Sequence, residues 1–296
     1  MQNFPKGNQR KLNETDQFLF VRMSRNRDLW SLTMRIINTL SPHLFSGSSQ
    51  ILQYWNSDLL ENLYFSPKAV HSSRKGKAIS DPSFLKKIER LSNFLANSHP
   101  DLLCEDMIRS FEEETEYTVG EQCLYLILGC NTTTIYTTEY LSKEVSVLCM
   151  ESLNGNPDML KMLLAHEFTH LIRKQLLQKD IFDSCIGERI VTEGIAENYS
   201  REAVPGMKES DYCLVNTSCI LWVQNHMEEM KTLVKDNLSN SSLMKDLFYM
   251  FAEIDYPVRS GYVYGYLAVK QYLEKNNLSV RDILSADWQI IMGEVL

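Results

Sequence analysis

The stretch NPDMLKMLLAHEFTHLIRKQLLQ, residues 156–178, gives the strongest structural signal in this sequence. Asn156 is a typical N-cap, Pro157 suits the first helical position, and Asp158 would lie at the positive end of the helix dipole. The apolar residues that follow recur at helical spacing to the end of the stretch. These local signals predict a single helix, and they place AHEFTH, residues 165–170, inside it.

Two histidines and a glutamate stand together in that helix. His166 and His170 are four residues apart, so their side chains project from one face and can converge on one point. Neutral imidazole is a good zinc ligand, and two from one helix make a bidentate clip. Glu167 is turned about 100° away, where it can take a proton from a water held on the metal. The simpler alternative is two histidines with ordinary partners on a half-buried helix.

A catalytic zinc site needs a third protein ligand and one open position. A histidine six residues after the second one, with a glycine between, is excluded, because those positions hold Leu176 and Arg173. The next predicted helix, residues 185–202, carries Glu193. His170 lies about 8 residues before the end of its helix and Glu193 about 8 after the start of its own, roughly 12 Å in each case. In an antiparallel hairpin the two side chains come level.

Other residues around this second helix also bear on the site. The small side chains of Gly194 and Ala196 would let the two helices approach closely. Asp183 and Glu188 are competing carboxylates, but they lie too near the connection to come level with the histidines. Glu197 is one turn past the proposed ligand and suits a supporting role, accepting the outer N–H of a ligating histidine. Its alternative is an ordinary solvated charge. The predicted cofactor is one Zn²⁺ per chain.

HEFTH followed by TEGIAE resembles the gluzincin-type HExxH zinc metallopeptidases. Within that group, LLAHEFTHLIR, EGIAE and the later GYVYGY are most similar to a bacterial family of predicted Zn-dependent proteases, over about residues 121–275. The resemblance implies an α+β, mostly α fold with a gluzincin-like catalytic domain. A small β-sheet would lie beside the HExxH helix, with a helical part after it. The implied activity is hydrolysis of peptide bonds through a metal-activated water.

The resemblance also implies an oxyanion donor and a binding strand. Tyr262 in GYVYGY matches best the tyrosine or histidine that steadies the tetrahedral intermediate, with Tyr264 and Tyr266 as alternatives and His226 as a weaker one. Tyrosines beside glycines can equally be packing at a turn. Arg259 could bind a substrate carbonyl or carboxylate. The strand EVSVLCMESL would be a sheet edge that binds an extended peptide.

The rest of the chain is organised more simply. We expect a helical N-terminal subdomain over residues 1–110 and the zinc metallopeptidase domain over 111–296. Residues 16–66 predict packed helices, HSSRKGKAISDP a solvated loop, and SFLKKIERLSNFLANSH an amphipathic helix. CLYLILG and EVSVLCMESL predict two strands, and YPVRSGYVYGY an interruption in a helical C-terminal part.

The composition limits the classes of partner and the cellular location that are expected. The 296 residues are 44% hydrophobic and 23% charged, as in an ordinary globular protein, and the net charge of −8 argues against nucleic-acid binding. No apolar run suits a signal peptide or a membrane span. Seven scattered cysteines without a CxxC pair predict reduced thiols and a cytoplasmic location. A peptide or protein substrate is expected.

Two other functions compete with peptide hydrolysis. One is a non-catalytic, zinc-stabilised regulatory or binding protein on a peptidase scaffold. Glu167 argues against it, since metal binding alone does not need that residue. The other is zinc-dependent hydrolysis of a non-peptide amide.

Overall fold

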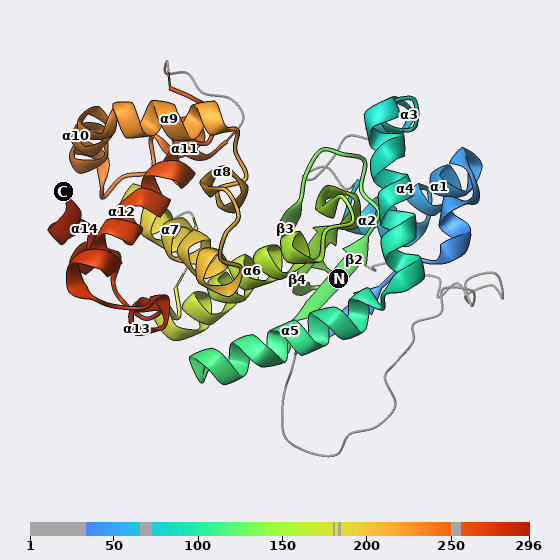
Figure 1. Ribbon diagram of the computed structural model, residues 1–296, viewed down its shortest axis with the longest axis horizontal. Helices are drawn as coiled ribbons and strands as arrows, with labels where there is room; N and C mark the ends of the chain where they lie inside the picture. Colours follow the sequence, from blue (N-terminus) through green and yellow to red (C-terminus); the bar gives the residue numbers. More distant parts are fainter. Residues whose placement is uncertain (1–33, 66–72, 180, 183–184, 250–255) are drawn as a thin grey trace, which may run out of the picture. The chain divides into compact units, whose positions relative to one another are not determined.

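The computed structural model describes residues 34–65, 73–179, 181–182, 185–249 and 256–296 (Figure 1). The chain forms two compact units. The first takes in the described parts of residues 35–92 together with 123–152, and the second takes in 93–122 and 153–296. Helices dominate, and the strands form one small sheet, which confirms the predicted α+β, mostly α class. The expected domain division near residue 110 stays a prediction.

A four-stranded mixed sheet forms the centre of the first unit. Its order is β1-β2-β4-β3, with β1, β2 and β4 parallel and β3 antiparallel to β4. The strands are β1 Arg35–Asn38, β2 Cys123–Ile127, β3 Ile135–Tyr140 and β4 Lys143–Cys149. The helical elements of this part of the chain are η2 Pro42–Ser46, α1 Ser48–Trp55, α2 Asp58–Leu63, α3 Arg74–Ile79, α4 Pro82–Asn97 and η3 Met150–Leu153.

The sequence predicted β2, β4 and α4 correctly, but the prediction of β4 as a sheet edge was wrong. β4 lies between β2 and β3, so its backbone groups are already paired on both sides. The two edge strands are β1 and β3, and β3 was not predicted. Its sequence IYTTEY is rich in β-branched and aromatic residues, a strand signal that its polar character obscured.

Two other N-terminal predictions need correction. Arg35–Asn38 was expected to be helical but forms β1, because its two isoleucines pair with β2, which is distant in the sequence. The expected loop at 71–82 contains helix α3. Lys75 in α3 is buried, and its ammonium donates to the carbonyl of Trp55 and pairs with Glu61. Such tertiary contacts have no local signal. Residues 16–33 lie outside the described part of the chain.

The second unit is built around helix α7, Ile186–Ala203. Every residue from Ile186 to Ser200 is buried, so this helix has no solvent face over that length. It packs against α6, Pro157–Leu177, and α12, Ser260–Asn276, which lie on either side of it in Figure 1. The other helices are α5 Pro100–Thr115, α8 Glu209–Tyr212, α9 Thr217–Asn225, α10 Met227–Asn237, α11 Met244–Phe248, α13 Val280–Ile283 and α14 Trp288–Val295.

The two helices predicted to carry the site are confirmed. α6 begins after Asn156, whose side chain accepts a hydrogen bond from the Asp158 N–H at 2.9 Å. α7 begins after Cys185, close to the predicted start. Arg173 joins the two helices because its fully buried guanidinium donates to Glu188 of α7 at 3.0 Å. In the described parts of the chain, no helix is long and apolar enough to cross a bilayer.

The interruption predicted over YPVRSGYVYGY is confirmed for residues 256–259, but the prediction is wrong for GYVYGY, which lies at the start of α12. Its glycines are needed for packing. A Cβ on Gly261 would lie 2.9 Å from Leu247 of α11, and one on Gly265 would lie 2.5 Å from the carbonyl oxygen of Ile190 in α7. Gly194 likewise faces α12, not α6 as expected from the hairpin. α12 is therefore pressed against the helix that carries Glu193.

Candidate metal centre

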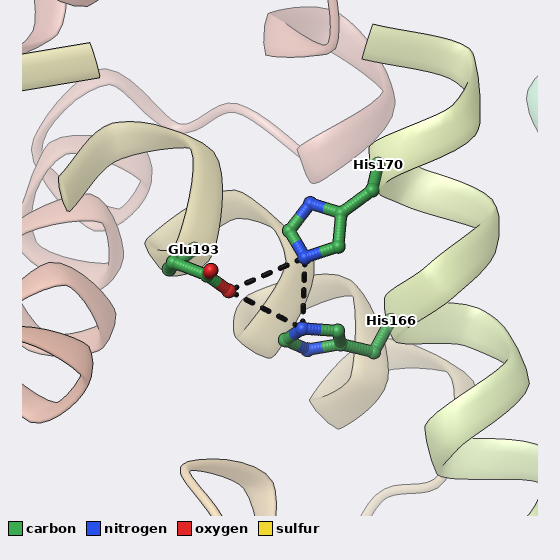
Figure 2. A group of neighbouring side chains, drawn as sticks. All are labelled: His166, His170 and Glu193. Atoms are coloured by element: carbon green, nitrogen blue, oxygen red, sulfur yellow. Dashed lines mark hydrogen bonds and ion pairs between the residues drawn. The ribbon is translucent and has the colours of Figure 1, made fainter. Parts of the chain in front are cut away.

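The side chains of His166, His170 and Glu193 converge on one point between α6 and α7 (Figure 2). The two Nε2 atoms are 2.9 Å apart. Oε2 of Glu193 lies 3.3 Å from Nε2 of His166 and 3.2 Å from Nε2 of His170. The structure thus brings together the three residues that the sequence predicted as zinc ligands.

This triangle of donor atoms fits a tetrahedral zinc ion. Ligand atoms about 2.0–2.1 Å from such an ion lie about 3.3 Å from one another, close to the three observed separations. Glu193 is 2% exposed, and its Oε2 has no other hydrogen-bond partner among the described residues. A cation would satisfy all three lone pairs at once. Within the described residues, this is the only such group of His, Cys, Asp and Glu side chains.

The charge states of His166 and Glu193 also suit a metal. Burial lowers the pKa of His166, and the neighbouring His170 lowers it further, so the imidazole is held neutral as a ligand must be. Burial alone would raise the pKa of Glu193. Arg189 and the two histidines outweigh it and hold that pKa well below its usual range, which keeps the carboxylate ionised.

Arg189 was missed by the sequence analysis. Its Nη2 donates to Oε1 of Glu193 at 2.8 Å and to the hydroxyl of Tyr262 at 3.3 Å. In sequence, an arginine four residues before a glutamate on a helix is most often a weak surface pair. Here the same spacing occurs in a helix that is buried all round. The polar residues of this helix are spread over several sides and form no single solvent face, and that pattern could have indicated a buried pair.

Tyr262 is the one tyrosine of GYVYGY that these contacts connect to the cluster. It is half-buried, and burial raises its pKa, so the phenol keeps its proton. Tyr264 is fully buried, and its hydroxyl has no partner among the described residues. The Tyr266 hydroxyl donates instead to Glu209 at 3.4 Å. Arg259 lies with its guanidinium 4.3 Å from the centre of the Tyr262 ring.

The comparison with known families agrees with this geometry. The model of the family described as "Predicted Zn-dependent protease (DUF2268)" matches residues 114–292. The chain belongs to this family. No curated protein and no solved structure matches the chain.

The remaining predicted acids of this family member are placed as follows. Glu167 follows His166 on α6 and is 6% exposed. Glu197 is fully buried, and neither of its oxygens has a hydrogen-bond partner among the described residues, so the predicted bond to a histidine is not formed. Burial and the neighbouring Glu193 raise the pKa of Glu197 well above its usual range, which favours a protonated carboxyl.

The alternative ligand Glu188 and the alternative oxyanion donor His226 have other partners. Glu188 binds Arg173 at 3.0 Å and Lys179 at 2.6 Å, so its carboxylate is engaged at the other end of the helix pair. His226 stacks on Trp222, and its Nδ1 is 2.8 Å from the carbonyl oxygen of that residue. Asp183 lies outside the described residues.

Proposed function

We propose that the protein is a zinc-dependent metallopeptidase of the gluzincin type that hydrolyses peptide bonds. The observation that carries the proposal is the buried triangle of His166 Nε2, His170 Nε2 and Glu193 Oε2. It lies beside a glutamate that metal binding does not use. One zinc ion per chain fills such a site, and the family description supports the same metal and reaction class.

Each residue then has a defined task. A bound zinc ion would act as a Lewis acid and make a water in its open position acidic. Glu167 takes the proton of the attacking water and passes it to the leaving nitrogen. The Tyr262 hydroxyl donates a hydrogen bond to the developing oxyanion. Arg259 binds a substrate carbonyl or carboxylate.

The cysteines and the net charge support proposals about cellular location and partners. All seven cysteines are free thiols and six are buried, which agrees with a reducing, cytoplasmic location. The partner is a peptide or protein substrate, and nucleic acid is not expected as a partner of a chain with a net charge of −8. We assign the activity to residues 111–296 and treat residues 1–110 as a separate N-terminal subdomain, which contributes β1 to the sheet.

The main alternative is a non-catalytic protein that uses zinc for stability or regulation. A structural zinc site normally has four protein ligands, whereas the described residues supply three, which favours catalysis. Hydrolysis of a non-peptide amide would use the same residues and differ only in substrate.

The test compares the zinc-loaded protein with Glu167→Gln. Both are incubated with a mixture of peptides, and new termini are identified by mass spectrometry. We expect Glu167→Gln to keep its zinc and to cleave at least about 100-fold more slowly, as for loss of a positioned general base. Glu228→Gln, at a side chain that is 89% exposed, is the matched control and should cleave normally. Cleavage at the full rate by Glu167→Gln would refute this mechanism. If the zinc-loaded parent cleaves no peptide or protein, the non-catalytic alternative is favoured.

A further inference from the structure

Arg189 connects two parts of the site that come from different helices. One nitrogen of its guanidinium lies 2.8 Å from Oε1 of Glu193 and 3.3 Å from the hydroxyl of Tyr262. We propose that Arg189 is a positioning residue that holds the metal-ligating carboxylate and the oxyanion donor in one fixed geometry. This inference rests on the proposed function, since it assigns Arg189 a task in that same site.

The first step of the argument concerns the two oxygens of Glu193. Oε2 faces the two histidines, whereas Oε1 is held by Arg189. With Oε1 engaged, the carboxylate can offer only one oxygen to a metal ion and cannot rotate freely about its terminal bond. Arg189 is itself 9% exposed, so little water competes for this contact. Such outer contacts orient metal ligands and raise metal affinity.

The second step concerns how the guanidinium is held. It lies 4.8 Å from the ring centre of Phe182 and 5.4 Å from that of Phe248. The same two rings meet the site, because Phe182 contacts His170 edge-on at 5.0 Å and Phe248 contacts Tyr262 edge-on at 5.2 Å. A planar guanidinium can lie against rings and donate from its edge, which a lysine ammonium cannot do.

The third step concerns the proton of Tyr262. A phenol has one proton and can also accept a hydrogen bond. Arg189 donates to the Tyr262 oxygen, which orients the ring and leaves the phenolic proton free for another acceptor. A substrate carbonyl oxygen that gains negative charge is such an acceptor. If Arg189 served only to stabilise α7, its contact with Tyr262 would have no effect on turnover.

The first experiment measures zinc affinity by competition with a chelator. Arg189→Met keeps an apolar chain between the two rings and removes the donor nitrogen, and we expect zinc binding to weaken by about 10- to 100-fold. Arg201→Met, near the end of the same helix, is the matched control and should bind zinc like the parent. Tyr262→Phe should also keep the parent affinity, because it leaves the Arg189–Glu193 contact in place. Parent-like affinity in folded Arg189→Met would overturn the proposal.

The second experiment measures peptide hydrolysis at saturating zinc. We expect Arg189→Met to lower kcat with a much smaller change in KM, because the oxyanion donor acts only in the transition state. The double variant Arg189→Met/Tyr262→Phe should lose less than the product of the two single losses, since both changes act on one donor. Fully multiplicative losses would overturn the link to Tyr262.

Arg189→Lys keeps the inference testable if the methionine variant does not fold. Lysine retains the charge but not the planar guanidinium that lies against Phe182 and Phe248, so we expect weaker zinc binding and a lower kcat than in the parent. Parent-like values of both in Arg189→Lys would refute the proposed role. The affinity measurements do not depend on turnover. Suppose that zinc affinity depends on Arg189 but the protein cleaves no peptide. That result would contradict the peptidase function and would still support the positioning of Glu193 by Arg189.

Discussion

A Cβ atom added to Gly194 would lie 2.2 Å from the carbonyl oxygen of Gly265, so α7 and α12 meet with almost no space between their backbones. Asn198 links the same two helices, because its side-chain amide donates to the carbonyl of Gly194 in α7 at 2.8 Å and to that of Tyr266 in α12 at 2.9 Å. Glu193 directly precedes one glycine, and Tyr262 lies almost one turn before the other. The close helix contact thus sets the distance between the metal ligand and the candidate oxyanion donor.

The first prediction is that Gly265→Ala destabilises the fold and the site together. Its Cβ would lie 2.5 Å from the Ile190 carbonyl oxygen, a backbone atom that cannot rotate away. We expect a loss of about 1–3 kcal/mol in the free energy of unfolding, the usual cost of overpacking. Denaturant unfolding measures it. Gly293→Ala in α14 is the control, since its Cβ would meet nothing within 4 Å, and alanine favours a helix. Equal stability of the two variants would contradict the close contact.

The second prediction concerns metal content. The parent should hold about one zinc per chain by elemental analysis, and His166→Ala or His170→Ala should remove most of it. His226→Ala is the matched control because that ring stacks on Trp222. Full retention of zinc by both ligand variants would refute the site.

Metal removal should also lower thermal stability. A ligand present at about 1,000 times its Kd stabilises the folded state by about 4 kcal/mol. The melting temperature should therefore fall on chelation and recover when zinc is added back. A melting temperature that is unchanged by chelation would mean that no metal is bound under these conditions.

Local signals allowed much of the metal centre to be predicted from the sequence. Asn156 and Pro157 mark the start of α6, and the four-residue spacing of its histidines fixes their common face. Glu193 could be found because depth along two connected helices can be counted. The contacts of Arg189 and Tyr262 could not be found in this way. They join residues 73 positions apart, through a helix packing that depends on glycines with no chemical signature of their own.

The same limit explains the errors in the first unit. β1 is a four-residue strand whose pairing partner begins at Cys123, so no nearby residue indicates a strand. β4 has the apolar sequence of a buried strand, and that pattern agrees with its interior place better than with the edge position that family resemblance suggested.

The third prediction concerns Glu197 and pH. Burial, followed by repulsion from Glu193, raises the pKa of Glu197 in the folded state, so folded protein holds a proton that unfolded protein releases above about pH 4.3. The stabilisation from this proton is complete below that pH and is lost as the pH rises towards the folded-state pKa. Over this range it falls by about 1.4 kcal/mol per pH unit. Glu197→Gln has no such proton, so its stability relative to the parent should increase with pH.

Denaturant unfolding of both proteins in a chelator, at several pH values, tests this prediction. Chelation removes the proton release that accompanies metal binding, and the histidine contributions are shared by the two proteins. A stability difference that does not change with pH would mean that Glu197 is ionised in the folded protein, against the direction inferred from its burial.

The last prediction assigns the oxyanion donor among three tyrosines. Tyr262→Phe removes only a hydroxyl, so zinc content should not change, while kcat should fall by about 10²-fold, as for loss of one oxyanion donor. KM should change much less. Tyr264→Phe and Tyr266→Phe are controls from the same helix, because one hydroxyl is buried without a partner and the other binds Glu209. Steady-state kinetics on any peptide that the parent cleaves would decide the matter. A large loss in either control with a normal Tyr262→Phe would assign the donor to that tyrosine, and full activity in all three would place the donor outside GYVYGY.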